Sequence, residues 1–133
     1  PYGALPAYPV PHSVRALLPF GRLFLQQGRW GDQQIIPQHW VRTSTLPVSH
    51  AGDRGGYGYM WWVTRDSMAW PEVILPAGSY SARGAGGHFC LVMPQQTLVI
   101  VHRVDTRQPG PEVNRFQIGA LLRTLFTALD KEA

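Results

Sequence analysis

The stretch SARGAGGHFCLVMPQQTLVIVHRVD, residues 81–105, decides the fold of this chain. It contains two apolar runs, 88–93 and 98–104, which are separated by the turn Pro94-Gln95-Gln96. Consecutive apolar positions are typical of strands that are covered on both faces, and Pro94 ends the first run because proline cannot donate a ladder hydrogen bond. The pattern predicts a central β-hairpin.

A helix is predicted after the hairpin, at about residues 112–130. Its apolar positions recur at helical spacing and form one stripe, made of Ile118, Leu121, Leu122, Leu125, Phe126 and Leu129. A helix with such a stripe must bury it, and the hairpin is the expected surface.

Shorter elements are predicted before the hairpin. A short helix is expected at about 19–27, because Pro19 suits a first turn and Gly28 suits the position just past the end. Its inward residues would be Phe20, Leu23 and Phe24. The remaining expectations are a Pro-rich irregular lead-in at 1–13, a turn at 28–32, a helix starting at Pro37, a loop at 47–56, one aromatic strand at 57–63, an irregular connection at 64–79 and a short strand at 79–83.

Composition excludes several classes of protein. The chain has 133 residues and a formal net charge of +4, so one domain is expected. Apolar residues make up 44% and charged residues 15%, which excludes a disordered charged tail. No apolar run approaches the roughly 18 residues of a membrane span. Nucleic-acid binding is not expected, because the 11 arginines are spread along the whole chain.

The cysteine and the histidines indicate neither a disulfide nor a metal site. Cys90 is the only cysteine, so no intrachain disulfide can form, and it is expected to pack as a small hydrophobe. The histidines have no metal-binding spacing, and no metal or cofactor is expected; they are His12, His39, His50, His88 and His102. No compartment is indicated.

The single lysine excludes one catalytic arrangement. A serine nucleophile with a lysine base needs Ser-x-x-Lys on one helical turn, so that the amine can take the hydroxyl proton. The only lysine is Lys131, and Ala128 stands three residues before it. A Gly-x-Ser-x-Gly nucleophile elbow is also absent from the sequence.

A glycine cluster remains, Arg83-Gly84-Ala85-Gly86-Gly87-His88, directly before the first apolar run. Glycines at this place allow a ligand or another backbone to approach closely and leave peptide N–H groups to face an anion. The same residues also fit a tight turn that enters the hairpin, and on physical grounds the turn is favoured.

Taken in order, three segments resemble the serine β-lactamase-like hydrolases, which include class C β-lactamases, related esterases, nylon-oligomer hydrolases and the penicillin-binding proteins. They are Phe20-Gly21-Arg22-Leu23 with Gly28-Arg29-Trp30 and Ile36-Pro37-Gln38-His39-Trp40, then Tyr57-Gly58-Tyr59-Met60-Trp61-Trp62, then residues 81–105. The resemblance covers about residues 15–130. It implies an α/β fold of the α+β type: the C-terminal part of a β-lactamase-like antiparallel sheet, packed by helices and ending in a long C-terminal helix, over residues 14–133.

The resemblance also implies a site. The third motif of the family, Lys-Thr-Gly or His-x-Gly, aligns with Ala85-Gly86-Gly87, which lacks the cationic or imidazole group. In the family, the residue after the glycine of that motif supplies an oxyanion-hole N–H; here that glycine corresponds to Gly87, and the N–H is that of His88. The Ser-x-x-Lys and Tyr-x-Asn elements of the family are absent, so these residues hold no complete catalytic site.

Two functions are therefore expected from the sequence. One is the C-terminal portion of a serine hydrolase that cleaves a small-molecule amide or ester through an acyl-enzyme, inactive without an upstream nucleophile. The alternative is a noncatalytic module that binds a partner or ligand through the aromatic strand Tyr57–Trp62. Under the first function, self-association through an open sheet edge is expected.

Overall fold

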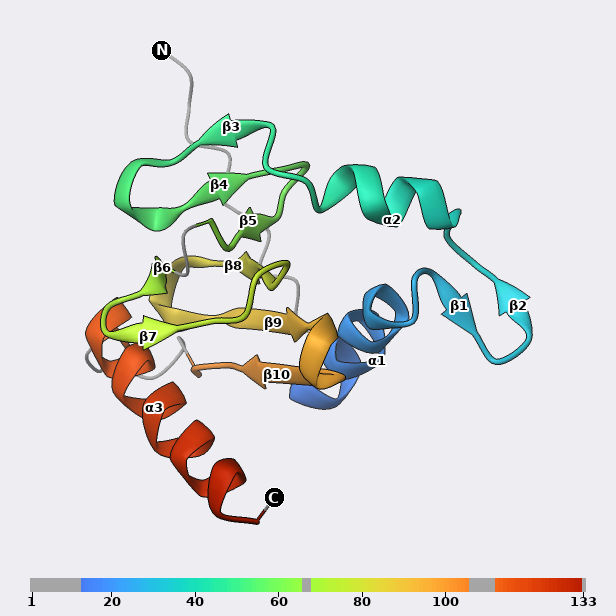
Figure 1. Cartoon of the computed structure of the whole chain (residues 1–133). Helices are drawn as coiled ribbons and strands as arrows, with labels where there is room; N and C mark the ends of the chain where they lie inside the picture. The colour runs from blue at the N-terminus through green and yellow to red at the C-terminus, as the bar shows by residue number, and fades with distance from the viewer. Residues whose placement is uncertain (1–12, 66–67, 106–111, 133) are drawn as a thin grey trace.

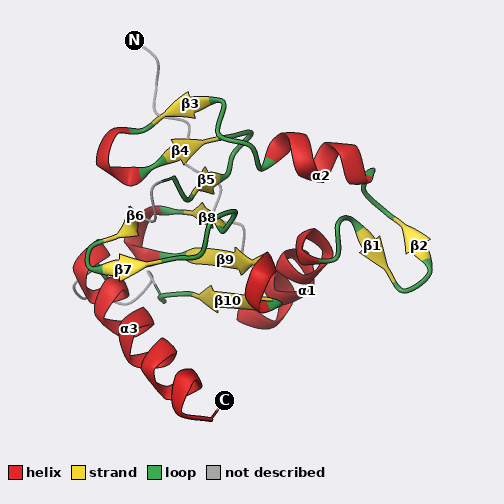
Figure 2. Cartoon of the chain, in the orientation of Figure 1, coloured by secondary structure: helices red, strands yellow, loops and turns green. Residues whose placement is uncertain are grey.

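The computed structural model describes residues 13–65, 68–105 and 112–132, and the Pro-rich lead-in at 1–12 lies outside the described residues. Figures 1 and 2 show a central antiparallel sheet with helices packed against it. In chain order the elements are α1 (Val14–Leu25), β1 (Arg29–Trp30), β2 (Gln33–Gln34), α2 (Gln38–Ser44), β3 (Ser49–His50), the 3-10 turn η1 (Gly52–Arg54), β4 (Gly56–Tyr57), β5 (Trp62–Val63), β6 (Met68–Trp70), β7 (Val73–Ile74), β8 (Tyr80–Arg83), η2 (Ala85–Gly87), β9 (Phe89–Met93), η3 (Pro94–Gln96), β10 (Leu98–His102) and α3 (Arg115–Glu132).

The main sheet is antiparallel and confirms the predicted fold class. Its strand order is β10-β9-β8-β5-β4-β3, while β1–β2 and β6–β7 form separate two-stranded hairpins. The predicted central hairpin is β9–β10, with Leu98 opposite Met93 and His102 opposite Phe89. Its turn is η3, and Thr97 completes it in a left-handed conformation with φ 53°.

Strand β9 is buried along its whole length, as consecutive apolar residues predict. Phe89, Leu91 and Met93 join a core that includes Ile118 and Leu122 of α3. The alternate residues, Cys90 and Val92, join a second core with Phe24 of α1. Because successive side chains of a strand point to opposite faces, α1 and α3 cover opposite faces of the sheet.

Strand β10 is only partly buried, because it lies at an edge of the main sheet. Among the described strands it pairs with β9 alone. A strand edge presents N–H and C=O groups to which another chain can add, so self-association through this edge stays a prediction.

Helix α1 differs from the expectation for residues 19–27. It begins at Val14, because the Ser13 hydroxyl accepts a hydrogen bond from the N–H of Ala16 at 3.2 Å and caps it, and Pro19 lies inside the helix. Gly21 and Phe24 are buried, whereas the predicted inward residue Phe20 is 42% exposed. Phe20 instead lies flat against Trp61, with ring centroids 5.8 Å apart.

The prediction of a single aromatic strand at 57–63 is wrong. The segment is a hairpin of β4 and β5, in which Tyr57 pairs with Trp62, and Met60 reverses the chain with φ 67°. The segment 64–79, predicted to be irregular, contains the paired strands β6 and β7. The predicted loop at 47–56 contains β3 and η1, and the predicted turn at 28–32 contains β1.

Helix α3 confirms the predicted C-terminal helix and starts three residues later than expected. Asn114 caps it: its Oδ1 accepts from the N–H groups of Phe116 at 3.0 Å and Gln117 at 3.1 Å. The Gln117 side chain in turn accepts from the N–H of Asn114 at 2.9 Å, which completes a capping box. In the predicted apolar stripe Ile118 and Leu122 are buried, whereas Leu121 and Leu129 are exposed.

No helix among the described residues has the length and apolar character needed to cross a bilayer.

Candidate functional site

The glycine cluster forms a tight turn between β8 and β9. The N–H of Gly84 donates to the carbonyl of His88 at 2.9 Å, and Ala85–Gly87 make one 3-10 turn. Gly86 and Gly87 have φ values of 76° and 91°, a conformation that favours glycine. A Cβ on Gly87 would lie 2.7 Å from both Cβ and O of Val113, so another backbone does approach here. The tight turn that the sequence favours is therefore present, and the backbone of Val113 approaches it closely.

Two histidines hold this turn against the end of β10. Nδ1 of His102 lies 2.8 Å from the carbonyl oxygen of Gly87, and its ring stacks on Phe89 with centroids 5.4 Å apart. Nδ1 of His88 accepts the N–H of Val104 at 3.1 Å. Both side chains therefore have a structural role.

The hydrogen bond from Val104 fixes the charge state of His88. An imidazole nitrogen that accepts a hydrogen bond carries no proton, so the ring is neutral in this arrangement. Burial, and next the positive charges of Arg103 and His102, lower the pKa of His88 from its ordinary value.

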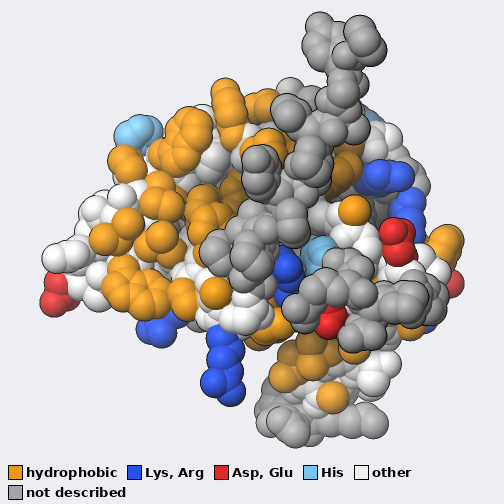
Figure 3. All heavy atoms as spheres, turned by 180° about the vertical axis from the view of Figure 1, so that it is seen from behind, with side chains coloured by type: hydrophobic (Ala, Val, Ile, Leu, Met, Phe, Trp, Pro, Cys, Tyr) orange, Lys and Arg blue, Asp and Glu red, His pale blue; other side chains and the backbone are white. Residues whose placement is uncertain are grey.

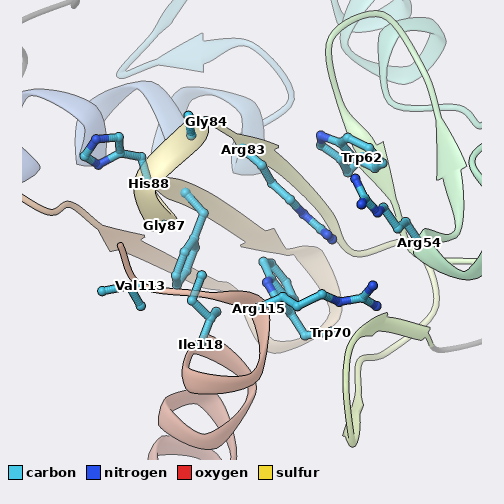
Figure 4. Close-up of a pocket in the computed structure, with 12 residues that line it drawn as sticks. Arg54, Trp62, Trp70, Arg83, Gly84, Gly87, His88, Val113, Arg115 and Ile118 are labelled. Atoms are coloured by element: carbon cyan, nitrogen blue, oxygen red, sulfur yellow. The ribbon is translucent and has the colours of Figure 1, made fainter. Parts of the chain in front are cut away.

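A pocket of about 460 Å³ opens beside the turn (Figure 4). The turn contributes Gly84, Ala85, Gly87 and His88 to its lining, so three of the four predicted site residues lie at the pocket. Gly86, the fourth, belongs to the same turn without lining the pocket. The rest of the lining is aromatic, aliphatic and cationic: Arg54, Trp62, Trp70, Arg83, Phe89, Val113, Arg115 and Ile118.

Arg83 is a site residue that sequence reasoning missed. Its guanidinium carbon lies 3.9 Å from the ring centroid of Trp70 and 5.3 Å from that of Trp62. Its Nε donates to Oγ of Ser81 at 2.8 Å. Desolvation, and to a smaller extent the positive charges of Arg115 and Arg54, together lower the pKa of Arg83 to about 10.

The register of the sheet explains the position of Arg83. Arg83 pairs with Phe89 across β8 and β9, and Phe89 belongs to the core on the α3 side. Paired residues point to the same face, so Arg83 extends toward the start of α3. The alternation within β8, with Tyr80 and Ala82 on the other face, is the sequence signal that could have indicated this.

The residues of the aromatic segment proposed for a binding module lie in different environments. Trp61 is buried in the core on the α1 side, and Trp62 lines the pocket. Tyr59 is exposed and lies against Trp40, with ring centroids 5.4 Å apart, while Met60 is 77% exposed. Figure 3 shows hydrophobic side chains gathered on one face of the molecule, as is common where proteins associate.

No three His, Cys, Asp or Glu side chains within the described ranges are grouped so that they could hold a metal ion. Cys90 is buried in the core on the α1 side, as predicted, and burial raises the pKa of its thiol to about 11.

Comparison with known proteins gives a likeness of fold. No family model matches the sequence, and no curated protein matches it. A solved structure described as "Putative 6-aminohexanoate-dimer hydrolase from Bacillus anthracis" matches with a TM-score of 0.60 at 21% sequence identity. The match covers 89% of this chain but 29% of that one, so this chain spans less than a third of the length of the hydrolase. The chain therefore shares, over most of its length, the fold of a portion of that hydrolase.

Proposed function

We propose that the glycine turn and the pocket beside it form one wall of the acyl site in a hydrolase with a β-lactamase-like fold. The reaction is cleavage of a small-molecule amide or ester by acylation of a serine, followed by hydrolysis of the acyl-enzyme. The observation that carries the proposal is the glycine turn at the pocket, on a fold shared with a hydrolase.

The proposed role of the turn is to present the backbone N–H of His88 to the oxyanion of the tetrahedral intermediate. Within the described part of the chain, this N–H meets no hydrogen-bond acceptor. The bonds from Val104 to His88 and between His102 and Gly87 hold the turn in place. A donor that is fixed before the reaction needs no reorganisation when the negative charge develops, which is the basis of oxyanion-hole catalysis.

The nucleophile would come from residues outside this sequence. Acylation needs a serine with a base, and the 133 residues contain no Ser-x-x-Lys. The first test is therefore the coding sequence upstream of these residues, which is expected to encode Ser-x-x-Lys and Tyr-x-Asn. A gene without them, or turnover by the purified 133-residue chain alone, would contradict the proposal.

The second test removes only the proposed donor. His88 has φ −70° and ψ 133°, a conformation open to proline, which has no N–H. In the longer protein, His88→Pro is expected to lower kcat by about 10²–10³ relative to His88→Ala, which loses the same imidazole but keeps the N–H. Substrates to assay are an aryl ester, a chromogenic β-lactam and the 6-aminohexanoate dimer, the compound named in the description of the structural neighbour.

Equal kcat values for folded His88→Pro and His88→Ala would rule out the His88 N–H as an oxyanion donor.

The alternative function, a noncatalytic binding module, has less support, because Trp61 of its proposed surface is buried in the core. It would gain support if the longer protein hydrolysed none of the three substrates.

A further inference from the structure

The two edges of the main sheet differ in how well they are protected from other chains. Strand β3 forms one edge with only two residues, and Pro47 lies two positions before it. Strand β10 forms the other edge with five residues, and its pairing with β9 contains no bulge. The sequence of β10 contains no proline and no Lys, Arg, Asp or Glu. Short strands, prolines, charges and bulges are the features that keep sheet edges from pairing, so only the β10 edge is left suited to it.

The register of the sheet shows which backbone groups face the open edge. The carbonyl of His88 accepts an N–H from the residue that follows β8, so the backbone of His88 faces β8. The facing direction alternates along a strand, so the backbone of Leu91 faces β10, where its partner is Ile100. By the same alternation, the N–H and C=O groups of Val99 and Val101 face away from β9. Strand β10 has no second neighbour in the described part of the chain, so these groups lie at the edge.

Helix α3 extends past this edge. Phe126 packs on the same core as Leu98 and Ile100 of β10. Leu129 lies three residues further along the same apolar stripe and is exposed. Figure 1 shows α3 continuing beyond β10, away from the rest of the sheet. The apolar stripe of the helix is therefore longer than the sheet is wide, and a strand added beside β10 would gain an apolar cover on that face.

The sequence of β10 is complementary to itself in one antiparallel register. A two-fold axis through Ile100 would place Val99 opposite Val101 of a second copy, and Leu98 opposite His102 of that copy. The outward-facing N–H and C=O groups then meet as hydrogen-bonded pairs, and Ile100 faces its own counterpart at a position without hydrogen bonds. Side chains of the two copies would also continue both cores. Other symmetric registers that use the same backbone groups pair fewer of the five residues.

We propose that β10 pairs with β10 of a second copy of this chain, antiparallel and centred on Ile100, so that the two main sheets join into one. The second copy supplies a strand that matches β10 in length, in the direction of its backbone groups and in the apolar character of both faces. This inference stands on the sheet edge of the 133-residue protein and does not depend on the proposed hydrolysis.

Sedimentation velocity of the purified protein over a range of concentrations tests the dimer. A dimer with a Kd of about 100 μM or tighter is expected. Val101→Pro removes an outward-facing N–H at a position where an edge strand tolerates proline, and circular dichroism checks that the variant folds. It should dimerise about tenfold or more weakly than Val101→Ala, which shortens the same side chain but keeps the N–H. A parent protein that is monomeric throughout, or equal affinity in the two folded variants, would overturn the proposal.

Disulfide cross-linking tests the register and does not depend on a proline variant. Antiparallel neighbours without hydrogen bonds have Cα atoms about 4.5 Å apart, within the range of a disulfide, so oxidation should link two copies of Ile100→Cys. Leu98→Cys is the matched control on the same face of β10. In the proposed register its two copies lie about 14 Å apart, too far for a disulfide. Cys90 is buried and present in both variants, so it does not distinguish them. Equal linking of both variants, or none of Ile100→Cys, would overturn the proposal.

Discussion

Gly21 of α1 lies directly against Cys90 of β9. A Cβ at Gly21 would stand 2.8 Å from Sγ of Cys90 and 2.6 Å from Cγ1 of Val99, closer than side-chain carbons come in folded proteins. This contact sets the distance between α1 and the sheet. The glycine is needed here for its size, because its backbone lies inside a regular helix.

Gly21→Ala should therefore destabilise the protein, although alanine is the better helix former. The gain in helix propensity is about 1 kcal/mol, whereas overpacking of a core costs about 1–3 kcal/mol. A net loss of about 1 kcal/mol is expected from urea unfolding. Adding Val99→Ala to Gly21→Ala should recover part of the loss, since it removes the nearest atom. An unchanged or higher stability for Gly21→Ala alone would show that the helix can move away freely.

Tyr80→Phe should stabilise the protein. The hydroxyl of Tyr80 is buried beside Trp61 and has no hydrogen-bond partner among the described residues. Burial raises the pKa of this phenol above its ordinary value, and Cys90 adds to the shift. An unsatisfied buried polar group costs about 1–3 kcal/mol, so its removal should raise the free energy of unfolding by about 1 kcal/mol.

The control for Tyr80→Phe is Tyr57→Phe, whose hydroxyl lies 3.8 Å from Sδ of Met60 at an exposed site. That change is expected to leave stability within about 0.5 kcal/mol of the parent protein. A clear loss of stability in Tyr80→Phe would mean that the hydroxyl has a partner.

Asn114→Ala should weaken the start of α3. It removes the acceptor for two N–H groups at the helix end, at a cost of about 1 kcal/mol. Asn114→Asp keeps the acceptor and should retain most of the stability. Thermal unfolding followed by circular dichroism compares the two variants. If both lost the same amount, the cap would not be what stabilises the helix end.

Stability should also depend on pH through His88. Its pKa is lowered in the folded state, so between that value and the ordinary 6.5 the unfolded chain binds more protons. The stabilisation is complete above about pH 6.5 and is lost as the pH falls through the folded pKa. Protonation also breaks the bond from Val104, because it places a proton on Nδ1.

Urea unfolding across this pH range, compared with His88→Asn, isolates the effect. Asparagine can accept the N–H of Val104 without titrating, so the variant should show a flatter dependence on pH. An NMR titration of the His88 ring with a midpoint above 6.5 would contradict the expected direction.

Cys90 should be unreactive in the folded protein. Burial raises the pKa of its thiol to about 11, and the thiolate is the reactive form. A colorimetric disulfide reagent is expected to modify it at the rate of global or local unfolding, and quickly in denaturant. Rapid modification of the native protein would show that α1 opens readily from the sheet.

The sequence predicts the β9–β10 hairpin and α3 well, because long apolar runs and a regular stripe dominate any local preference. It fails at β4–β5, where each strand has two residues and the turn depends on Met60 in a left-handed conformation. No residue typical of a turn separates the aromatic residues there, so the sequence indicates one strand. The early start of α1 was predictable from Ser13, a favoured N-cap residue.

The candidate site was predictable only in part. The glycine turn is local, and its position before an apolar strand is visible in the sequence. The grouping of Arg54, Arg83 and Arg115 at the pocket is not local: Arg83 meets Trp62 because β8 pairs with β5, and Arg115 lines the same pocket from the start of α3. Charge counts along a chain carry no information about such convergence, which depends on the strand order.

The burial of β9 on both faces has a consequence for how this fold is specified. A shift of one residue in its pairing would exchange the two cores, sending Cys90 and Val92 toward α3 and Leu91 toward α1. In a strand with one wet face, such a slip would bury polar groups and be rejected. In β9 the residues on both faces are apolar, so the hydrophobic pattern does not distinguish the native register from one shifted by one residue. The register of β9 is therefore set by the turns at its two ends, which contain the left-handed Thr97 on one side and Gly86 and Gly87 on the other.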